Sequence, residues 1–407
     1  MWPVVLAATA VPWLRSRLTA KTKAEVRIED AGRRAQPAAS TESGAVVSER
    51  QSESLPRSIV VELVARFPVV RPGWPARRQV NLSDTIVAPE LEDYQTMARR
   101  LQAPALIKEL SDWQTWLGAQ ALSIPLVIDP ALAYLPWEAM LTLALPAAKD
   151  SAWRETLQFW RSGGAPVLRV PVESRWQQGA VLAVCAPNWR LMVEKGWSAL
   201  RPLVIPTANV ETALASTTIK LLHLVGTTIG TGADLRFLVP DRPAGSHEQS
   251  AAEEPAALRR GTLLASNALP LASTPIIVLQ AEPARLTRRL HADRQQMSML
   301  RRYAAEAFSA GAQAIILLPA LPRDLGEAIL QIMAKHLGGT PPDVPRLLQA
   351  LTVMRQTIVG WRAPASDAAP DHVDTAMLES EAVVHQPDLR DSQMELAMDV
   401  CLYARSA

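Results

Sequence analysis

Cysteine and histidine most often supply nucleophiles, bases and metal ligands, and both are scarce in this chain. The two cysteines, Cys185 and Cys401, lie far apart without paired spacing, so the sequence offers neither a disulfide framework nor a thiolate zinc cluster. The six histidines are scattered, and none forms an HExxH pair or another metal-ligand spacing. We therefore expect no metal and no cofactor.

The ends of the predicted strands are the places to search for chemistry, because ligands of parallel sheets gather beyond the carboxyl ends of the strands. Cys185 follows a predicted strand at 181–184, and its apolar neighbours favour a buried small hydrophobe. His223 lies inside the next apolar run, roughly 13 Å below Thr227 at about 3.3 Å per residue, which favours a core or supporting histidine. Glu282 comes shortly after a third predicted strand, at 276–280.

Glu282 could make a polar contact with Thr227 or Asp234, or act as a binding group of its own. Capping of the helix expected from residue 285 is the plainer alternative. The glycines of GTTIGTG, at 226–232, suggest a phosphate cradle only superficially, because the Lys-Ser or Lys-Thr of a P-loop and the GxGxxG order are both missing. An ordinary loop is favoured there.

Three arginines, Arg285, Arg288 and Arg289, form a basic patch on that expected helix and could contact nucleic acid. No stacking aromatics are interleaved with them, and the formal net charge of the chain is only +2. A solvated face, or pairing with acidic residues at 367–395, is therefore favoured over nucleic-acid binding.

The wider pattern alternates short apolar runs with helical segments, which predicts an α/β fold. Continuous runs joined by helices are typical of a largely parallel sheet that is covered on both faces. The predicted strands are at 124–128, 166–170, 181–184, 221–225, 276–280 and 314–318, and the predicted helices at 208–215, 285–310 and 324–337. A helix and strand at 394–404 close the domain.

Composition shifts divide the chain into three parts. Residues 1–57 are a predicted flexible extension, because 30–56 are mainly Ala, Ser, Glu and Arg without periodicity. Residues 58–175 form an accessory part with a strand hairpin and two helices separated at Pro104. Residues 176–407 form the α/β core. The polar segments at 241–255 and 363–392 are predicted surface insertions.

The amino terminus, MWPVVLAATAVPWL, resembles a signal peptide only weakly. It lacks a basic start, and Pro3 and Pro12 interrupt a run that is too short to span a bilayer. We expect a soluble cytoplasmic protein, with at most a weak membrane contact through these residues and the basic side chains after them.

Five segments together resemble the CHAT domain, a caspase-like peptidase family that is widespread in bacteria. They are LPWEAM at 135–140, LLHLVGTTIG at 221–230, IIVLQAEPA at 276–284, YAAEAFSAGAQAIILLPALP at 303–322 and VCLYA at 400–404. The resemblance covers 58–407. It implies a caspase-like, largely parallel sheet flanked by helices, with an N-terminal hairpin-helix accessory layer.

The resemblance also locates the family's catalytic positions in this chain. The catalytic histidine falls on Thr227, the glycine after it on Thr228, and the catalytic cysteine on Glu282. A cysteine peptidase needs a thiolate and an imidazole within hydrogen-bond reach, and threonine and glutamate supply neither. The resemblance thus implies a member without the peptidase dyad.

The function expected on this basis is that of an inactive pseudopeptidase. A groove near Thr227, Glu282 and residues 228–236, with His223 and Cys185 beneath it, would bind a protein segment, and the partner would be supplied in trans within a bacterial stress or defence module. Two alternatives remain open: an active cysteine-type peptidase that uses the displaced pair Cys185 and His223, and a nucleic-acid-associated subunit that uses the basic patch.

Overall fold

The computed structural model describes most of the chain between residues 23 and 405. The described ranges are 23–30, 56–66, 77–87, 94–101, 104–117, 122–129, 132–145, 157–163, 176–206, 209–231, 234–241, 261–271, 274–282, 294–339, 341, 343–361 and 389–405. The chain divides into two compact units, of which the first comprises 1–133 and 140–162 and the second 134–139 and 163–407. Each unit is described separately.

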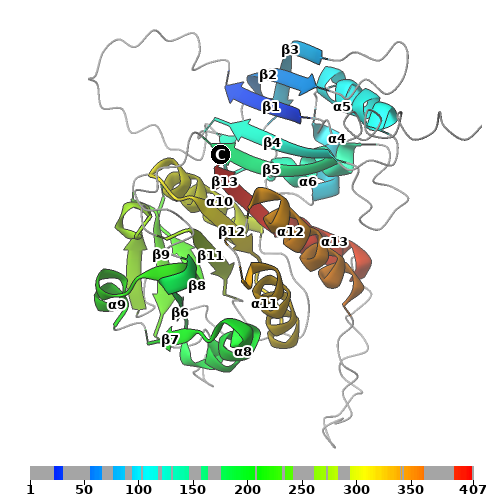
Figure 1. Ribbon diagram of the computed structural model, residues 1–407. Helices are drawn as coiled ribbons and strands as arrows, with labels where there is room; N and C mark the ends of the chain where they lie inside the picture. The colour runs from blue at the N-terminus through cyan, green and yellow to red at the C-terminus, as the bar shows by residue number, and fades with distance from the viewer. Residues whose placement is uncertain are drawn as a thin grey trace, which may run out of the picture. The chain divides into compact units, whose positions relative to one another are not determined.

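The first unit contains a mixed sheet (Figure 1). Its strands are β1 (Lys23–Asp30), β2 (Pro56–Arg66), β3 (Arg77–Val87), β4 (Leu122–Ile128) and β5 (Leu157–Gly163). They are ordered β3-β2-β1-β4-β5, with β1 antiparallel to β2, β2 antiparallel to β3, and β4 parallel to both β1 and β5. The β2–β3 hairpin is the one that the alternating sequence predicts.

Two helices accompany this sheet, α4 (Tyr94–Arg100) and α5 (Pro104–Leu117). Pro104 is the first residue of α5, where a missing N–H costs nothing, so the predicted break between the helices is confirmed. A further helix, α6 (Trp137–Ala144), has residues 137–139 in the second unit and 140–144 in the first, and Trp137 and Glu138 are both buried.

The second unit is built on a largely parallel sheet. The strands are β6 (Ala180–Val184), β7 (Leu203–Ile205), β8 (Ile219–Ile229), β9 (Arg236–Pro240), β10 (Gly261–Ala265), β11 (Ile276–Ala281), β12 (Ala314–Leu318) and β13 (Cys401–Arg405). The order β7-β6-β8-β11-β12 is parallel throughout, and β13 is antiparallel to β12. The predicted α/β class is therefore confirmed.

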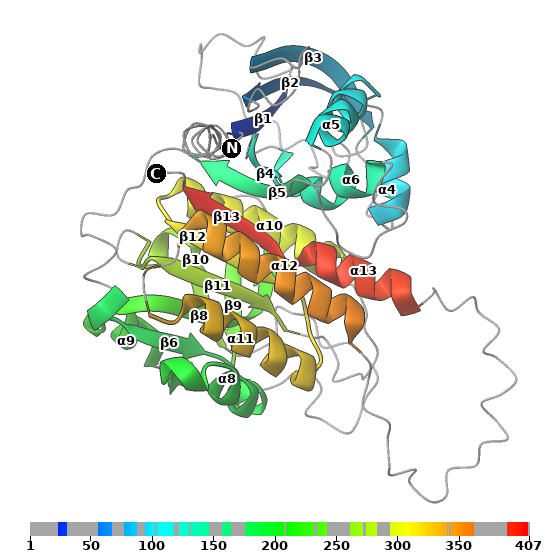
Figure 2. The same cartoon turned by 45° about the vertical axis from the view of Figure 1, so that its right-hand side comes forward.

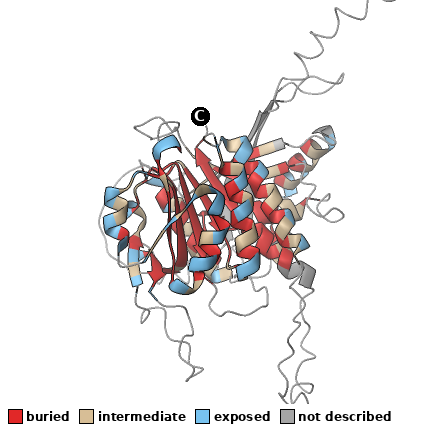
Figure 3. Ribbon diagram, turned by 60° about the horizontal axis from the view of Figure 1, so that its bottom comes forward, coloured by how far each residue is buried: buried red, intermediate tan, exposed pale blue. Residues whose placement is uncertain are grey.

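Helices cover both faces of this sheet. They are α8 (Arg190–Gly196), α9 (Val210–Ser216), α10 (Arg294–Ser309), α11 (Arg323–Leu337), α12 (Val344–Gly360) and α13 (Leu389–Asp399). Figure 2 shows α11 and α12 side by side over one face, and α10 lies over the opposite one. The strands are buried and the outward sides of the helices are exposed (Figure 3).

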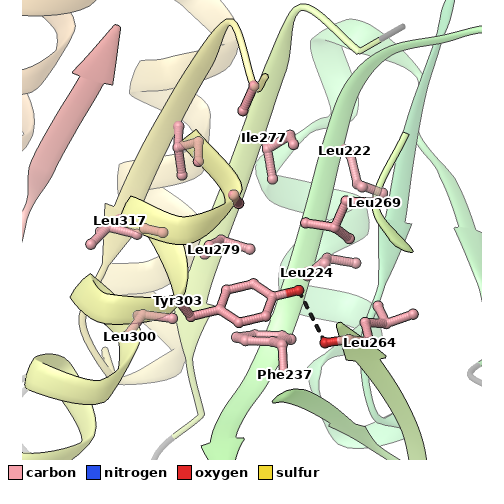
Figure 4. Packing of buried hydrophobic residues seen from close by; sticks show 14 of the residues in the cluster. Leu222, Leu224, Phe237, Leu264, Leu269, Ile277, Leu279, Leu300, Tyr303 and Leu317 are labelled. Atoms are coloured by element: carbon pink, nitrogen blue, oxygen red, sulfur yellow. Dashed lines mark hydrogen bonds between the residues drawn. The ribbon is translucent and has the colours of Figure 1, made fainter. Parts of the chain in front are cut away.

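The main hydrophobic core of the second unit lies between the sheet and α10 (Figure 4). This core contains Leu222 and Leu224 of β8, and Ile277 and Leu279 of β11. The two residues from each strand are two positions apart, because alternate side chains of a strand share one face. Tyr303 of α10 is fully buried among them, and its hydroxyl donates a hydrogen bond of 3.1 Å to the carbonyl of Leu264.

Strand β8 is longer than the sequence predicts, which corrects the position of the expected loop. Its last residues, Thr227 to Ile229, pair with β9 instead of forming a loop at the strand tip. Gly226 makes this possible because a Cβ at that position would lie 2.1 Å from the carbonyl oxygen of Leu238. The β-branched residues that follow suit an extended strand.

Other elements also depart from the sequence prediction. Strand β1 falls within 1–57, which the sequence predicts to be a flexible extension. This segment forms a strand because it pairs with β2 and β4. Strand β5 and helix α12 were not predicted, and α13 begins inside the predicted insertion at 363–392. The predicted strand at 166–170 and insertion at 241–255 lie almost wholly outside the described residues.

A buried ion pair joins α10 to α13. Arg301 is 1% exposed and Asp399 is 0% exposed, and their side chains are 2.5 Å apart. The main-chain carbonyl of Arg301 also accepts a hydrogen bond from the Tyr403 hydroxyl of β13, at 3.2 Å. Helix α13 and strand β13 are thus attached to α10 by an ion pair and a hydrogen bond as well as by apolar packing.

None of the described helices is both long enough and apolar enough to cross a lipid bilayer.

We expect Asp399→Ala to lower the free energy of unfolding by about 3–5 kcal/mol, because it leaves the Arg301 guanidinium buried without its carboxylate. Urea unfolding followed by circular dichroism measures this loss. Asp112→Ala, which removes the exposed pair with Lys108, is the matched control and should change stability by less than about 0.5 kcal/mol. Equal effects of both changes would contradict the structural role of the buried pair.

Candidate functional site

The ends of β8 and β11 bring together the two positions to which the sequence resemblance points. These strands are parallel neighbours, and Gly226 lies opposite Ala281 in their register. The next residues along the chain are Thr227 and Glu282, and the Glu282 main-chain N–H donates to the Gly226 carbonyl over 2.7 Å. Thr227 and Glu282 therefore lie side by side where the ladder between β8 and β11 ends.

Gln296, in the first turn of α10, joins the two strand ends. Its side-chain amide nitrogen donates to the hydroxyl of Thr227 over 3.1 Å and to the main-chain carbonyl of Glu282 over 3.2 Å. Thr227 and Gln296 are partly exposed, whereas Glu282 is only 3% exposed. The accessible rim of this site thus consists of a hydroxyl and an amide.

The carboxylate of Glu282 is directed toward the segment that follows β6. Trp189, in a short 3-10 helix at Pro187–Trp189, donates its indole N–H to Glu282 Oε1 over 3.1 Å, and the indole is 2% exposed. A buried polar group of this kind needs hydrogen-bond partners to offset the loss of water. The hydrogen bond from Trp189 holds the carboxylate at the place where the resemblance puts a nucleophile.

His223 is fully buried in β8 and is hydrogen-bonded at both ring nitrogens. The indole of Trp197 donates to Nδ1 over 3.0 Å, and Nε2 lies 3.1 Å from Gln280 Oε1. Because Nδ1 accepts the hydrogen bond from the Trp197 indole, Nε2 must carry the ring hydrogen and donates a hydrogen bond to Gln280 Oε1. These contacts fix the neutral imidazole in a single tautomer.

Burial lowers the pKa of His223 from 6.5 to about 4, because the imidazolium would lose its hydration, and the hydrogen bond to Gln280 opposes this shift only partly. The ring is therefore neutral near pH 7. Its two nitrogens are both occupied by core side chains, so His223 has no free position from which to accept a proton from a nucleophile.

Cys185 follows β6 and is buried, and its thiol is neutral. Burial raises the pKa of Cys185 to about 12, with further raising contributions from Glu194 and Glu282 and a lowering one from Arg190. The thiolate is the nucleophilic form, so this thiol is unreactive near neutral pH. The ring nitrogens of His223 bond to Trp197 and Gln280, and no hydrogen bond joins His223 to Cys185.

The remaining candidate residues are Thr228, Asp234 and the three arginines of the basic patch. Thr228 is in the strand and is buried, and Asp234 is exposed in the turn between β8 and β9, where its N–H bonds to the Thr231 carbonyl over 3.1 Å. Gly230 opens this turn with a φ of +85°, which glycine adopts without strain. The basic patch of Arg285, Arg288 and Arg289 lies outside the described residues.

Sequence reasoning did not find the four residues that hold the site together: Trp189, Trp197, Gln280 and Gln296. Gln280 alone carried a signal, because a glutamine in an otherwise apolar run predicts a buried hydrogen-bond partner. Trp189 and Trp197 lie eight positions apart on the segment after β6 and both donate indole N–H groups into the sheet. The spacing of the two tryptophans does not predict Glu282 and His223 as their acceptors.

No family model matches the chain, and no curated protein matches it. Within the ranges that the structure describes, no three His, Cys, Asp or Glu side chains gather in a way that could hold a metal ion.

The arrangement can bind through hydrogen bonds but has no group suited to acyl transfer. Covalent catalysis needs an activated nucleophile beside a base. In this cluster the carboxylate of Glu282 is engaged with an indole, the hydroxyl of Thr227 accepts from an amide, and the imidazole of His223 is held within the core. What remains accessible is the polar rim of Thr227 and Gln296.

The buried neutral histidine should make the protein less stable in acid. The pKa of His223 is depressed in the folded state, so the unfolded chain binds the extra proton first, and stability falls as the pH drops from about 6.5 to about 4. The loss attributable to His223 should reach about 3 kcal/mol. Urea unfolding of the wild type and of His223→Gln across this range measures it, and parallel pH profiles of the two proteins would refute the assignment.

Cys185 should resist iodoacetamide in the folded protein at pH 8 and react only after unfolding in urea, because its pKa is raised to about 12 by burial. Peptide mass spectrometry resolves alkylation at Cys185 from alkylation at Cys401, which is also buried and serves as the internal control. Rapid native alkylation of Cys185 alone would contradict this environment.

Proposed function

We propose that the protein is a catalytically inactive CHAT-type pseudopeptidase that serves as a protein-binding scaffold or regulatory subunit. Its partner is supplied in trans, and we place it in the cytoplasm of a bacterium, in a stress or defence module. The observation that carries the proposal is that Thr227 and Glu282 follow directly on the last residue pair of β8 and β11, where the resemblance puts a histidine and a cysteine.

The geometry supports the correspondence of these positions. A catalytic histidine and cysteine must lie within hydrogen-bond reach, so the strands that carry them have to be neighbours with their ends aligned. β8 and β11 meet this requirement, since Gly226 is paired with Ala281 immediately before the two positions. Thr227 and Glu282 keep the placement of a dyad, but neither residue supplies an imidazole or a thiol.

The alternative of an active peptidase that uses Cys185 and His223 has less support. It would need Cys185 as a thiolate and His223 as an accessible base, whereas the thiol has a pKa raised to about 12 and the imidazole is fully buried between Trp197 and Gln280. Binding needs none of these groups. It needs only an accessible polar surface, which Thr227 and Gln296 provide.

A peptidyl acyloxymethyl ketone tests the absence of catalysis. We expect no labelling of the wild-type protein, because no thiolate stands at the site, and labelling at residue 282 in the double variant Thr227→His, Glu282→Cys, which restores both groups. The single variant Glu282→Cys is the control and should react more slowly. Labelling of wild-type Cys185 together with peptide cleavage would overturn the proposal in favour of an active peptidase.

Affinity purification of the tagged protein from its native host tests the scaffold role. We expect a stoichiometric partner that remains uncleaved, and we expect Thr227→Arg to reduce its recovery because the new side chain crowds the site. Gln331→Arg, an identical added charge on the exposed surface of α11, is the matched control and should leave recovery unchanged. Loss with both variants, or with neither, would contradict binding at this site.

A further inference from the structure

The first turn of α10 makes polar contacts on two opposite sides. On one side, Nη2 of Arg294 donates to both carboxylate oxygens of Glu395 in α13, over 2.9 and 2.7 Å. On the other, Nε2 of Gln296 donates to the Thr227 hydroxyl and the Glu282 carbonyl. Side chains two positions apart leave an α-helix about 200° apart, because a turn has about 3.6 residues. One helical turn thus connects α13 with the ends of β8 and β11.

The contact with α13 continues along the same face of α10. Arg301 lies two helical turns after Arg294 and forms the buried ion pair with Asp399, which is one turn after Glu395 on α13. Two ion pairs on one face of a helix fix its rotation about its own axis. That rotation decides the direction in which Gln296 points.

The pair at the first turn is the one that bears on Gln296. The main-chain N–H groups of the first four residues of a helix have no acceptor within the helix, so side-chain contacts hold this turn more than the next one. Arg294 and Gln296 belong to the first turn, whereas Arg301 lies beyond it. The side chains of Arg294 and Glu395 are 32% and 11% exposed, so solvent screens their attraction less than that of a surface pair.

Helix α13 has other anchors that do not involve Glu395. The side-chain amide of Gln393 donates to the Trp361 carbonyl over 2.6 Å. Arg355 of α12 is 2% exposed, and its guanidinium donates to the Val400 carbonyl over 2.9 and 3.2 Å. Removal of the Glu395 carboxylate should therefore loosen the first turn of α10 and leave α13 in place.

We propose that Glu395 is a positioning residue for the polar rim formed by Thr227 and Gln296. Its carboxylate holds Arg294, and so keeps the first turn of α10 in the rotation at which the Gln296 amide reaches Thr227 and Glu282. Without the carboxylate this turn frays, and the hydrogen bonds of Gln296 open more often. The proposal rests on the proposed scaffold function and adds a residue of α13 to the site that holds the partner.

The Gln296 side-chain amide reports on this positioning in NMR spectra of the full-length protein labelled with ¹⁵N-glutamine. Its signal is assigned by its loss in Gln296→Ala. We expect the amide hydrogens to exchange with water about fivefold faster in Glu395→Leu, which keeps the volume but removes the charge, because one charge-assisted hydrogen bond is lost. Arg294→Met removes the same pair from its other side and should give the same acceleration. Unchanged exchange in both variants would overturn the proposal.

Two further variants separate positioning from a general loss of stability. Asp399→Asn should lower the melting temperature more than Glu395→Leu does, because its ion pair is fully buried, but should accelerate the exchange of the Gln296 amide less. Glu395→Asp keeps a carboxylate near Arg294 and should retain most of the protection. Exchange that follows the melting temperature across these variants, or equal acceleration in Glu395→Asp and Glu395→Leu, would assign the effect to stability or packing and refute positioning.

Recovery of the partner from the native host tests whether Glu395 acts through Gln296. Glu395→Leu should reduce recovery, and it should cause no further reduction in the Gln296→Ala background. Effects of residues that act through one contact are not additive, whereas an independent structural effect of Glu395 would persist in that background. A further loss in the double variant would therefore contradict the proposal.

The two readouts distinguish failure of this proposal from failure of the scaffold function. If Glu395→Leu accelerates exchange of the Gln296 amide but Gln296→Ala leaves partner recovery unchanged, Glu395 positions the rim and the rim is not the binding site. If Gln296→Ala reduces recovery while Glu395→Leu changes neither readout, the scaffold function stands and positioning by Glu395 is refuted.

Discussion

The parallel pairing of β8 with β11 is the constraint on which the rest of the second unit depends. It places Gly226 opposite Ala281 and so sets Thr227 beside Glu282 at a common edge. On the α10 face of the sheet, the two strands place leucine and isoleucine side chains in the main core. On the other face, they bring His223 and Gln280 within hydrogen-bond distance of each other. The same register therefore determines both the packing and the site.

Two indole hydrogen bonds connect the segment after β6 to this pair of strands. Trp189 and Trp197 satisfy Glu282 and His223, two groups that would be costly to bury alone. Tryptophan suits this role because it adds a large apolar area and a single N–H donor. The outcome is a cluster in which the imidazole of His223 is held neutral and in one tautomer, whereas a general base has to accept a proton.

The end of β8 is closely packed against β9. Gly226 allows β9 to cross near the strand, and β9 then holds Thr227 to Ile229 extended after β11 has ended. Thr227 is thereby held beside Gln296, with which it forms the polar rim.

The sequence by itself determined the fold class and most strands of the second unit, because continuous apolar runs bounded by turn residues have few other structures open to them. It also determined that no imidazole or thiol follows the two central strands. It missed β1, which is strand only because β2 and β4 pair with it, and it ended β8 too early because the pairing with β9 is non-local. Only the tertiary structure decided that Glu282 meets Trp189 and that His223 is enclosed by Trp197 and Gln280, since each contact depends on residues distant in sequence.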